Sequence, residues 1–342
     1  MKLLVLGGTR FLGRHIVDAA RARNHAVTVF TRGRQPSPRG DGVVQLIGDR
    51  DPRIAPGLAA LETEHWDGVI DTSGYVPRIV GASTSLLESR TARYLFVSSL
   101  SVYKQSARAG QDETTPRLPP VEQDNEDVAK HYGALKASCE DVVGQRFGNR
   151  ATVVRPGLIV GPYDPTDRFS YWIARFMHPS LLGKRPDRAV VPAPRERAIQ
   201  FIDARDLGQW IVELLERDLG GTFNAVSPAG QWTMGALIDA LVDAAPDAPT
   251  PAWIDDATLD MHHVEPWTGL PLWIPAGDTD SAGFLAFDAS KAQRAGLRTR
   301  PLAQTIADIA AWLAARDNAG AWQHVLAADA EKVILADHSR LR

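Results

Sequence analysis

The chain of 342 residues is long enough to bury a large core, either as one large domain or as a domain with a smaller partner lobe. Its 44% apolar and 23% charged residues are ordinary for a globular protein, and a formal charge of −3 argues against a nucleic-acid or anionic membrane surface. The single cysteine, Cys139, excludes an intrachain disulfide and suits a cytoplasmic protein. We expect no secretion signal, because the chain starts directly on the strand-like "KLLVL", and no membrane span.

Short apolar runs alternate with amphipathic stretches through the first half of the chain. Strands are predicted at 2–6, 26–30, 43–47, 67–72, 94–99 and 151–155. Helices are predicted between them at 11–23, about 54–63, 76–89 and 126–147. This alternation favours an α/β, Rossmann-type doubly wound parallel sheet that is covered on both faces. Such a sheet binds its ligands at the carboxyl ends of the strands.

After about residue 156 the pattern changes, and Pro, Trp and Arg become frequent. The strands predicted here are shorter, at 189–192, 198–203 and 222–226, and helices are predicted at 168–177, 205–217, 233–244 and 301–315. We therefore predict a first, cofactor-binding domain at 1–156. A smaller α/β substrate lobe is predicted at 157–342, with segments at about 198–226 returning to the main sheet.

A glycine-rich turn, "GGTRFLG" at 7–13, follows the first strand and opens the first helix. That context is the one a dinucleotide-binding turn requires: Gly7 and Gly8 permit close backbone approach to a pyrophosphate, and the helix N-terminus supplies free N–H groups. Arg10 stands where the middle glycine of G-x-x-G-x-x-G is expected. A purely structural tight turn is the alternative interpretation.

The second strand distinguishes between the two nicotinamide cofactors. An NAD site usually has an acid at its end, whereas this chain has Phe30 there, with Arg32 and Arg34 just beyond. Guanidinium groups bind a phosphate in a bidentate manner, so Arg10 and Arg32 are predicted to form a clamp for the 2′-phosphate of NADP. Solvated loop arginines are the alternative. Asp49 is placed to meet the adenine, or it forms a turn.

A candidate catalytic pair stands in "HYGALK", where Tyr132 and Lys136 share one face of a helix. A free tyrosine has a pKa of about 10 and is a poor base at neutral pH. A nearby ammonium and an oxidised nicotinamide would lower that pKa. The preceding strand ends in "FVSSLSVYK", which offers Ser98, Ser99 and Ser101 as hydroxyls to hold a substrate oxygen.

On these residues the chain resembles the extended short-chain dehydrogenases/reductases, the NAD(P)-dependent epimerase/dehydratase family. "GGTRFLG", "GDR", "VIDTSGY", "FVSSLSVY", "YGALK", "VVRPGLIVGP" and "AIQFIDARDLG" match family landmarks in family order. The resemblance implies that Ser99 is the catalytic hydroxyl, Tyr132 the acid/base, and Lys136 a ligand of the nicotinamide ribose as well. It implies a cofactor site made by Gly7, Gly8, Thr9, Arg10, Phe11, Leu12, Gly13, Arg32, Asp49, Arg50, Ser73, Gly74, Tyr75, Lys136 and Pro156.

Two departures from the family pattern bear on the substrate. Nucleotide-sugar enzymes of the group usually have an asparagine where this chain has Leu158, and an arginine where it has Ile199 or Gln200. An apolar residue cannot replace a charge-assisted contact to a diphosphate, although a rearranged site could use Arg197. The residues expected to contact substrate are Ser99, Tyr75, Tyr163, Arg168, Trp172 and Arg197.

The predicted function is an NADP(H)-dependent oxidoreductase acting on a carbonyl or alcohol of a small polar or sugar-like substrate, with NAD(H) as a possible cofactor. The alternatives are a redox-neutral epimerase with bound NAD(P), and a non-catalytic NADP sensor or RNA-binding relative. Dehydration is disfavoured, because Leu100 and Ser101 stand where dehydratases carry acids. We expect no metal site, no nucleic-acid or membrane partner, and a monomer or homodimer.

Overall fold

A computed structural model describes residues 1–35, 42–104, 108–122, 125–184, 187–316 and 322–340. Within these residues a seven-stranded sheet has the strand order β11-β6-β5-β4-β1-β2-β3, and every pairing in it is parallel. Its strands are β1 (Lys2–Leu6), β2 (Ala26–Thr31), β3 (Val43–Ile47), β4 (Trp66–Asp71), β5 (Thr91–Val97), β6 (Ala151–Pro156) and β11 (Gly221–Ala225). The α/β doubly wound prediction is confirmed.

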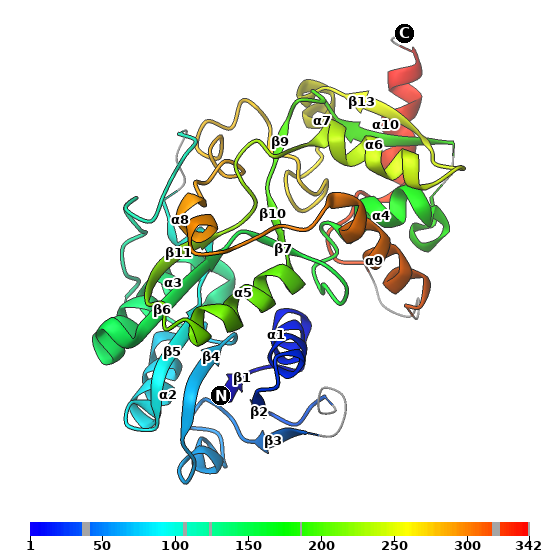
Figure 1. Ribbon diagram of the computed structural model, residues 1–342. Helices are drawn as coiled ribbons and strands as arrows, with labels where there is room; N and C mark the ends of the chain where they lie inside the picture. Colours follow the sequence, from blue (N-terminus) through cyan, green and yellow to red (C-terminus); the bar gives the residue numbers. More distant parts are fainter. Residues whose placement is uncertain (36–41, 105–107, 123–124, 185–186, 317–321, 341–342) are drawn as a thin grey trace.

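Helices cover both faces of this sheet (Figure 1). One face carries α1 (Phe11–Ala22) and α5 (Ala204–Glu216), and the other carries α2 (Pro77–Leu87) and α3 (Val128–Phe147). Side chains alternate along each strand: Leu3 and Val5 pack with α1 and α5, whereas Leu4 and Leu6 pack with α2 and α3. Because both faces are covered, the central strand β1 is apolar along Leu3–Leu6 instead of alternating, whereas the edge strand β3 is partly exposed.

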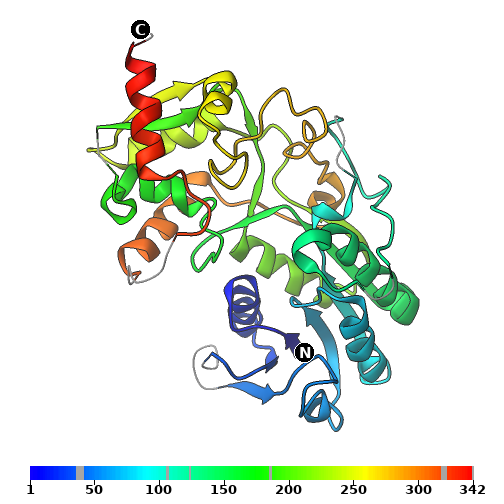
Figure 2. The ribbon, with the colours of Figure 1, turned by 180° about the vertical axis from the view of Figure 1, so that it is seen from behind.

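The rest of the chain forms a smaller α/β part beyond the carboxyl edge of the sheet (Figure 1). Its strands are β7 (Leu158–Val160), β8 (Arg188–Pro192), β9 (Ala198–Ile199), β10 (Phe201–Asp203), β12 (Trp232–Thr233) and β13 (Thr250–Ile254). Its helices are α4 (Ser170–Met177), α6 (Met234–Ala244), α7 (Asp256–Met261), α8 (Ser290–Arg294), α9 (Leu302–Ala314) and α10 (Ala328–Arg340). Most of these elements share a core of their own, whereas α8 packs against β11 and contributes Ala292 to the core under the main sheet. Helix α10 stands at the outer end of the C-terminal part (Figure 2).

The structure differs from the sequence prediction at particular elements. The helix predicted at about 54–63 is only a 3₁₀ turn at Ala59–Leu61, because Pro52, Pro56 and Gly57 interrupt the segment. The strand predicted at 198–203 divides at Gln200 into β9 and β10, neither of which joins the main sheet, whereas β11 pairs with β6. None of the described helices is long and apolar enough to cross a membrane.

Candidate active site

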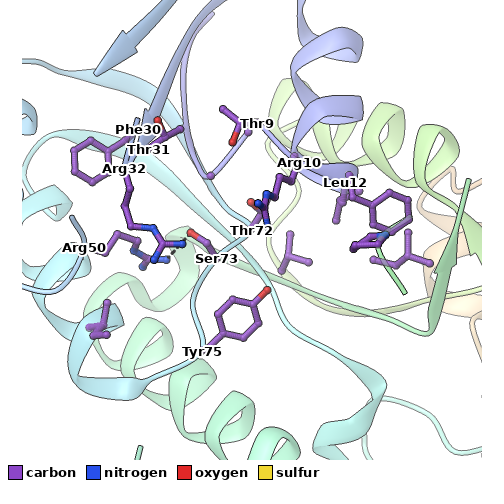
Figure 3. Close-up of a pocket in the computed structure, with 18 of the residues that line it drawn as sticks. Thr9, Arg10, Leu12, Phe30, Thr31, Arg32, Arg50, Thr72, Ser73 and Tyr75 are labelled. Carbon is purple, nitrogen blue, oxygen red and sulfur yellow. Dashed lines mark hydrogen bonds between the residues drawn. The ribbon is translucent and has the colours of Figure 1, made fainter. Parts of the chain in front are cut away.

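A cavity of about 710 Å³ opens at the carboxyl edge of the sheet. The loop between β1 and α1 forms one wall, and the ends of β2, β4, β5 and β6 contribute others. Figure 3 shows residues from these separate strand ends converging on it. Most of the predicted cofactor residues line this cavity, with Gly74 the exception, because its carbonyl is turned to Lys136 instead.

The glycines of the loop at 7–13 let the start of α1 approach the loop backbone more closely than larger residues would permit. Gly7 and Gly8 have φ of +109° and +92°, in the region that favours glycine. A Cβ on Gly13 would lie 2.6 Å from the Gly8 amide nitrogen, so α1 begins directly against the loop. The backbone of the loop and the first turn of α1 therefore face the cavity without covering side chains, which is the surface that a pyrophosphate needs.

The cavity wall is rich in cations that have no acidic partner. The side chains of Arg10, Arg32 and Arg34 line it and are exposed, and in the described part of the chain none of them forms an ion pair or a side-chain hydrogen bond. In Figure 3, Arg10 extends from the loop and Arg32 from beyond β2 toward the region where Ser73 lies. Unpaired guanidinium groups around one cavity attract an anionic ligand.

Arg50 also lines the cavity but is differently engaged. Its Nη1 and Nη2 donate to the two carboxylate oxygens of the buried Asp71, at 2.6 and 2.7 Å, and its Nε donates to Ser83. The Tyr94 hydroxyl donates to the same carboxylate at 2.7 Å. Arg50 is thus fixed by an ion pair beneath the cavity, unlike the exposed Arg10 and Arg32. The Asp49 carboxylate accepts the Asp51 amide, so the turn-forming role is present.

Lys136 is almost completely buried, with 2% of its surface exposed. Its ammonium donates to the carbonyl of Gly74 at 2.8 Å and to the carbonyl of Val97 at 2.6 Å. Burial lowers the pKa of Lys136 to about 8, partly opposed by Cys139 and Asp71. An ammonium has three donors, so one N–H remains to face the cavity, which Lys136 lines.

Tyr132 lies one helical turn before Lys136 on α3 and lines the same cavity. Burial raises the pKa of Tyr132 to about 12, with a smaller rise from Tyr75 and an opposing contribution from hydrogen bonding to Ser99. Burial outweighs the lowering expected from the sequence, which also required the charge of an oxidised nicotinamide. Tyr132 is therefore protonated at neutral pH.

The close approach of α3 to the end of β5 depends on Gly133. A Cβ there would lie 2.1 Å from the Ser101 carbonyl oxygen and 2.9 Å from a Leu118 methyl group, so a larger residue would push the helix away. On the facing turn the Ser99 hydroxyl accepts the Ser101 amide at 3.1 Å, which holds Ser99 against the cavity. Ser99, Tyr132 and Lys136 are thus brought together at one end of the cavity.

Some cavity residues were missed by sequence reasoning. They are Thr31, Gln35, Gly48, Thr72, Ile79, Val97, Gly157, Ile159 and Pro165. Thr31 and Thr72 stand at the carboxyl ends of β2 and β4, where any residue of this fold class borders the ligand site, so strand position was the available signal. Ser98 also lines the cavity, and its buried hydroxyl has no hydrogen-bond partner in the described chain.

The predicted substrate residues are dispersed. Tyr75 lines the cavity, with its ring 6.4 Å from that of Tyr132. The Tyr163 ring is instead stacked under the Arg14 guanidinium at 3.9 Å, beside His15. Arg168 lies over Trp267, outside the lining of the cavity.

Two of these substrate assignments are revised. Trp172 is fully buried in the core of the C-terminal part, and its indole N–H donates to the Pro271 carbonyl, so it has no surface for a ligand. Arg197 is ion-paired with Asp256 and donates to the carbonyls of Ala193 and Ile274, so four of its five N–H donors are already used. A bidentate phosphate contact from Arg197 would have to break some of these bonds.

The residues present fit a dinucleotide cofactor. The loop glycines give the close backbone approach, the unpartnered Ser98 hydroxyl offers a buried hydrogen bond, and the arginines supply positive charge. Three or more metal-ligating His, Cys, Asp or Glu side chains are nowhere grouped in the part of the chain that the structure describes.

Comparison with known proteins agrees with this geometry. The family model described as "NAD dependent epimerase/dehydratase family" matches residues 3–225. The chain is 28% identical over 186 residues to the chloroplast stem-loop binding protein of 41 kDa b of Arabidopsis thaliana, covering 50% of this chain and 46% of that protein. It is 28% identical over 177 residues to the 2-alkyl-3-oxoalkanoate reductase of Stenotrophomonas maltophilia, covering 48% of this chain and 52% of that protein.

The chain thus spans about half the length of these curated relatives. Among solved structures it resembles UDP-glucuronic acid 4-epimerase from Bacillus cereus in complex with NAD, with a TM-score of 0.65 and 16% identity. That comparison covers 92% of this chain and 99% of the epimerase chain. At such identity the similarity is one of fold.

The burial of Lys136 leads to a prediction about pH and stability. Its pKa is about 8 in the folded chain against an ordinary 10.5, so between these values the unfolded state binds more protons and stability rises with pH. Relative to Lys136→Met, the wild type should gain about 3 kcal/mol between pH 7.5 and 10.5, since each pKa unit is worth about 1.4 kcal/mol. Denaturant unfolding of both proteins across this range measures the difference.

Lys130→Met is the matched control, because Lys130 is on the same helix but its side chain is 78% exposed. Its stability should follow the wild type in parallel across the pH range. Parallel curves of stability against pH for Lys136→Met and the wild type would contradict a lowered pKa of Lys136 in the folded chain.

Proposed function

We propose that this chain, which belongs to the NAD-dependent epimerase/dehydratase family, is an NADP(H)-dependent reductase of carbonyl compounds, or the corresponding alcohol dehydrogenase. The observation that carries the proposal is the set of Ser99, a protonated Tyr132 and a buried Lys136 at one end of a cavity edged by unpaired arginines. A cofactor sensor or an RNA-binding protein has no need of such a proton donor.

Bound NADPH supplies the hydride that reduces the carbonyl carbon. The chain's own residues handle the oxygen: the Ser99 hydroxyl donates a hydrogen bond to it, and Tyr132 donates the proton that completes the alcohol. Proton donation leaves a phenolate, which the neighbouring ammonium of Lys136 stabilises. In the reverse direction Tyr132 accepts the proton of the alcohol.

The preference for NADP(H) rests on Arg10 and Arg32. Both are unpaired in the described chain, both line the cavity, and the end of β2 carries Phe30 instead of an acid. A carboxylate at that position would repel a 2′-phosphate, whereas guanidinium groups bind it. Solved structures of similar fold are complexes with NAD, so the preference is specific to these residues of this chain.

A redox-neutral epimerase is the second candidate, favoured by the family match. It would use the same three residues and return the hydride to its substrate. Such an enzyme holds its cofactor through the whole cycle, whereas a reductase releases it. The name of one relative, 2-alkyl-3-oxoalkanoate reductase, supports the reductase.

If Arg10 and Arg32 form a clamp for the 2′-phosphate, replacing either of them should weaken the binding of NADPH. Each hydrogen bond to a charged group is worth about 1.5–3 kcal/mol, so Arg10→Ala and Arg32→Ala should each weaken NADPH binding by about tenfold or more. NADH binding should change little, because NADH lacks the 2′-phosphate. Calorimetric titration of cofactor-stripped protein with both cofactors measures this.

The exposed Arg53, which lies outside this cavity, provides the matched control, and Arg53→Ala should bind both cofactors as the wild type does. Tighter binding of NADH than of NADPH, or equal losses for both cofactors, would eliminate the clamp. NAD that cannot be stripped from the protein would favour the epimerase.

Catalysis is tested by Tyr132→Phe, which removes only the hydroxyl. General acid–base catalysis contributes typically about 10²–10⁴-fold, so NADPH oxidation in the presence of carbonyl substrates should fall by at least about 100-fold. NADPH affinity should stay unchanged. Tyr163→Phe, outside the cavity lining, should retain activity, and a Tyr132→Phe protein that retains its function would point to the sensor or RNA-binding alternative.

A further inference from the structure

A second cavity, of about 570 Å³, lies beside the first, and Tyr132 lines both. It is enclosed by the turn after β5, the first turns of α3 and the segment at 280–287. Ser99 lines the first cavity and Leu100, the next residue, lines the second. Tyr132, the proton donor of the proposed reaction, therefore stands in the wall between the first cavity, which is lined by arginines, and the second one.

The enclosed part of the second cavity is mostly apolar, with two polar exceptions, the half-buried Ser101 and the buried Gln111, whose amide donates to the Lys104 carbonyl. Leu100, Tyr103 and Phe287 are buried, and Leu118 and Phe284 are half-buried. The rings are packed on each other: Phe287 lies 5.7 Å from Tyr103 and 6.4 Å from Phe284. The charged lining residues, Lys104, Lys130 and Asp280, are all exposed, so they edge the cavity instead of forming its interior.

The aromatic wall of the second cavity is formed by Tyr103, Phe284 and Phe287, and its one side-chain polar atom, the Tyr103 hydroxyl oxygen, already has hydrogen-bond partners. The Tyr103 hydroxyl donates to Asn224 at 2.7 Å and accepts from Arg155, which is itself paired with Glu140. Tyr103 therefore presents its ring to the cavity while its hydroxyl is bound on the other side. A sugar entering here would lose hydrogen bonds to water without finding new ones on this wall, which costs binding free energy.

Gln200 fixes the other part of the wall. Its buried amide accepts the Phe287 N–H at 3.0 Å and donates to the Phe287 carbonyl at 2.9 Å. The backbone of Phe287 is thus held from both sides, and its ring is directed by the fold, not by a ligand. Gln200 is a positioning residue here, and no charged group stands at its place to grip a diphosphate.

We propose that the second cavity is the substrate site and that the substrate is a carbonyl compound with an apolar alkyl or aryl body. This rests on the proposed function, because Tyr132 must deliver a proton to the carbonyl oxygen from the shared wall. It replaces the polar or sugar-like substrate expected from the sequence, since the wall beside the proton donor is aromatic. The volume is within the range of small-molecule pockets, about 300–1,000 Å³.

Direct binding to the NADP⁺-loaded protein tests the proposal, with 4-phenyl-2-butanone as the apolar ketone and UDP-glucose as the polar competitor. The ketone should bind, and Phe284→Ala and Leu118→Ala should each weaken it by at least about fivefold, because burial of a few methylene equivalents is lost. Met261→Ala, which truncates an exposed apolar side chain outside the cavity, should bind the ketone as the wild type does.

NADPH affinity, measured on the same variants, reports that they are folded. The proposal is overturned if UDP-glucose binds the loaded protein more tightly than the ketone, or if the two cavity variants bind the ketone unchanged. Turnover separates this failure from that of the proposed function. Tyr132-dependent reduction of dihydroxyacetone without ketone binding would overturn the apolar site alone, whereas absence of NADPH binding would overturn the function itself.

Discussion

The ammonium of Lys136 is the constraint on which the site depends. A charge with 2% exposure is costly to bury, and its two carbonyl partners are on Val97, which ends β5, and on Gly74, in the loop that follows the neighbouring β4. The bonds can form only if α3 lies in one position and rotation against β4 and β5. That position places Tyr132, one turn earlier, beside the Ser99 turn, and Gly133 permits the approach because a Cβ there would collide with the Ser101 carbonyl.

Charge divides the carboxyl edge of the sheet into two regions. Beneath the first cavity, the charges of Arg50 and Asp71 neutralise each other. The pair therefore fixes the loops after β3 and β4 and leaves no net charge for a ligand to balance. Arg10 and Arg32 above it have no such partner among the described residues. On the far side of Tyr132 the wall is aromatic and its polar atoms are paired. The two cavities therefore suit ligands of opposite character, a phosphate-rich cofactor and an apolar carbonyl compound.

The sequence predicted best those features of the site that depend on local backbone geometry. Strand periodicity, the glycine loop and the Tyr132/Lys136 spacing are local signals, and the structure brings these residues to one edge of a parallel sheet. The roles of Trp172 and Arg197 could not be judged from local sequence. Trp172 is buried against Pro271, and Arg197 is paired with Asp256, and both partners lie far along the chain. The aromatic cavity was hidden for the same reason, since Phe284 and Phe287 meet Tyr103 across about half the chain.

Transfer of deuterium from NADPH labelled at the nicotinamide C4 tests the account most directly. The protein would be incubated with the labelled cofactor and an apolar ketone, and the alcohol analysed by mass spectrometry. The account predicts one deuterium at the carbinol carbon of each product molecule, formed with consumption of one NADPH. Binding of NADPH without any transfer, or exchange of configuration in a substrate without net NADPH oxidation, would contradict it.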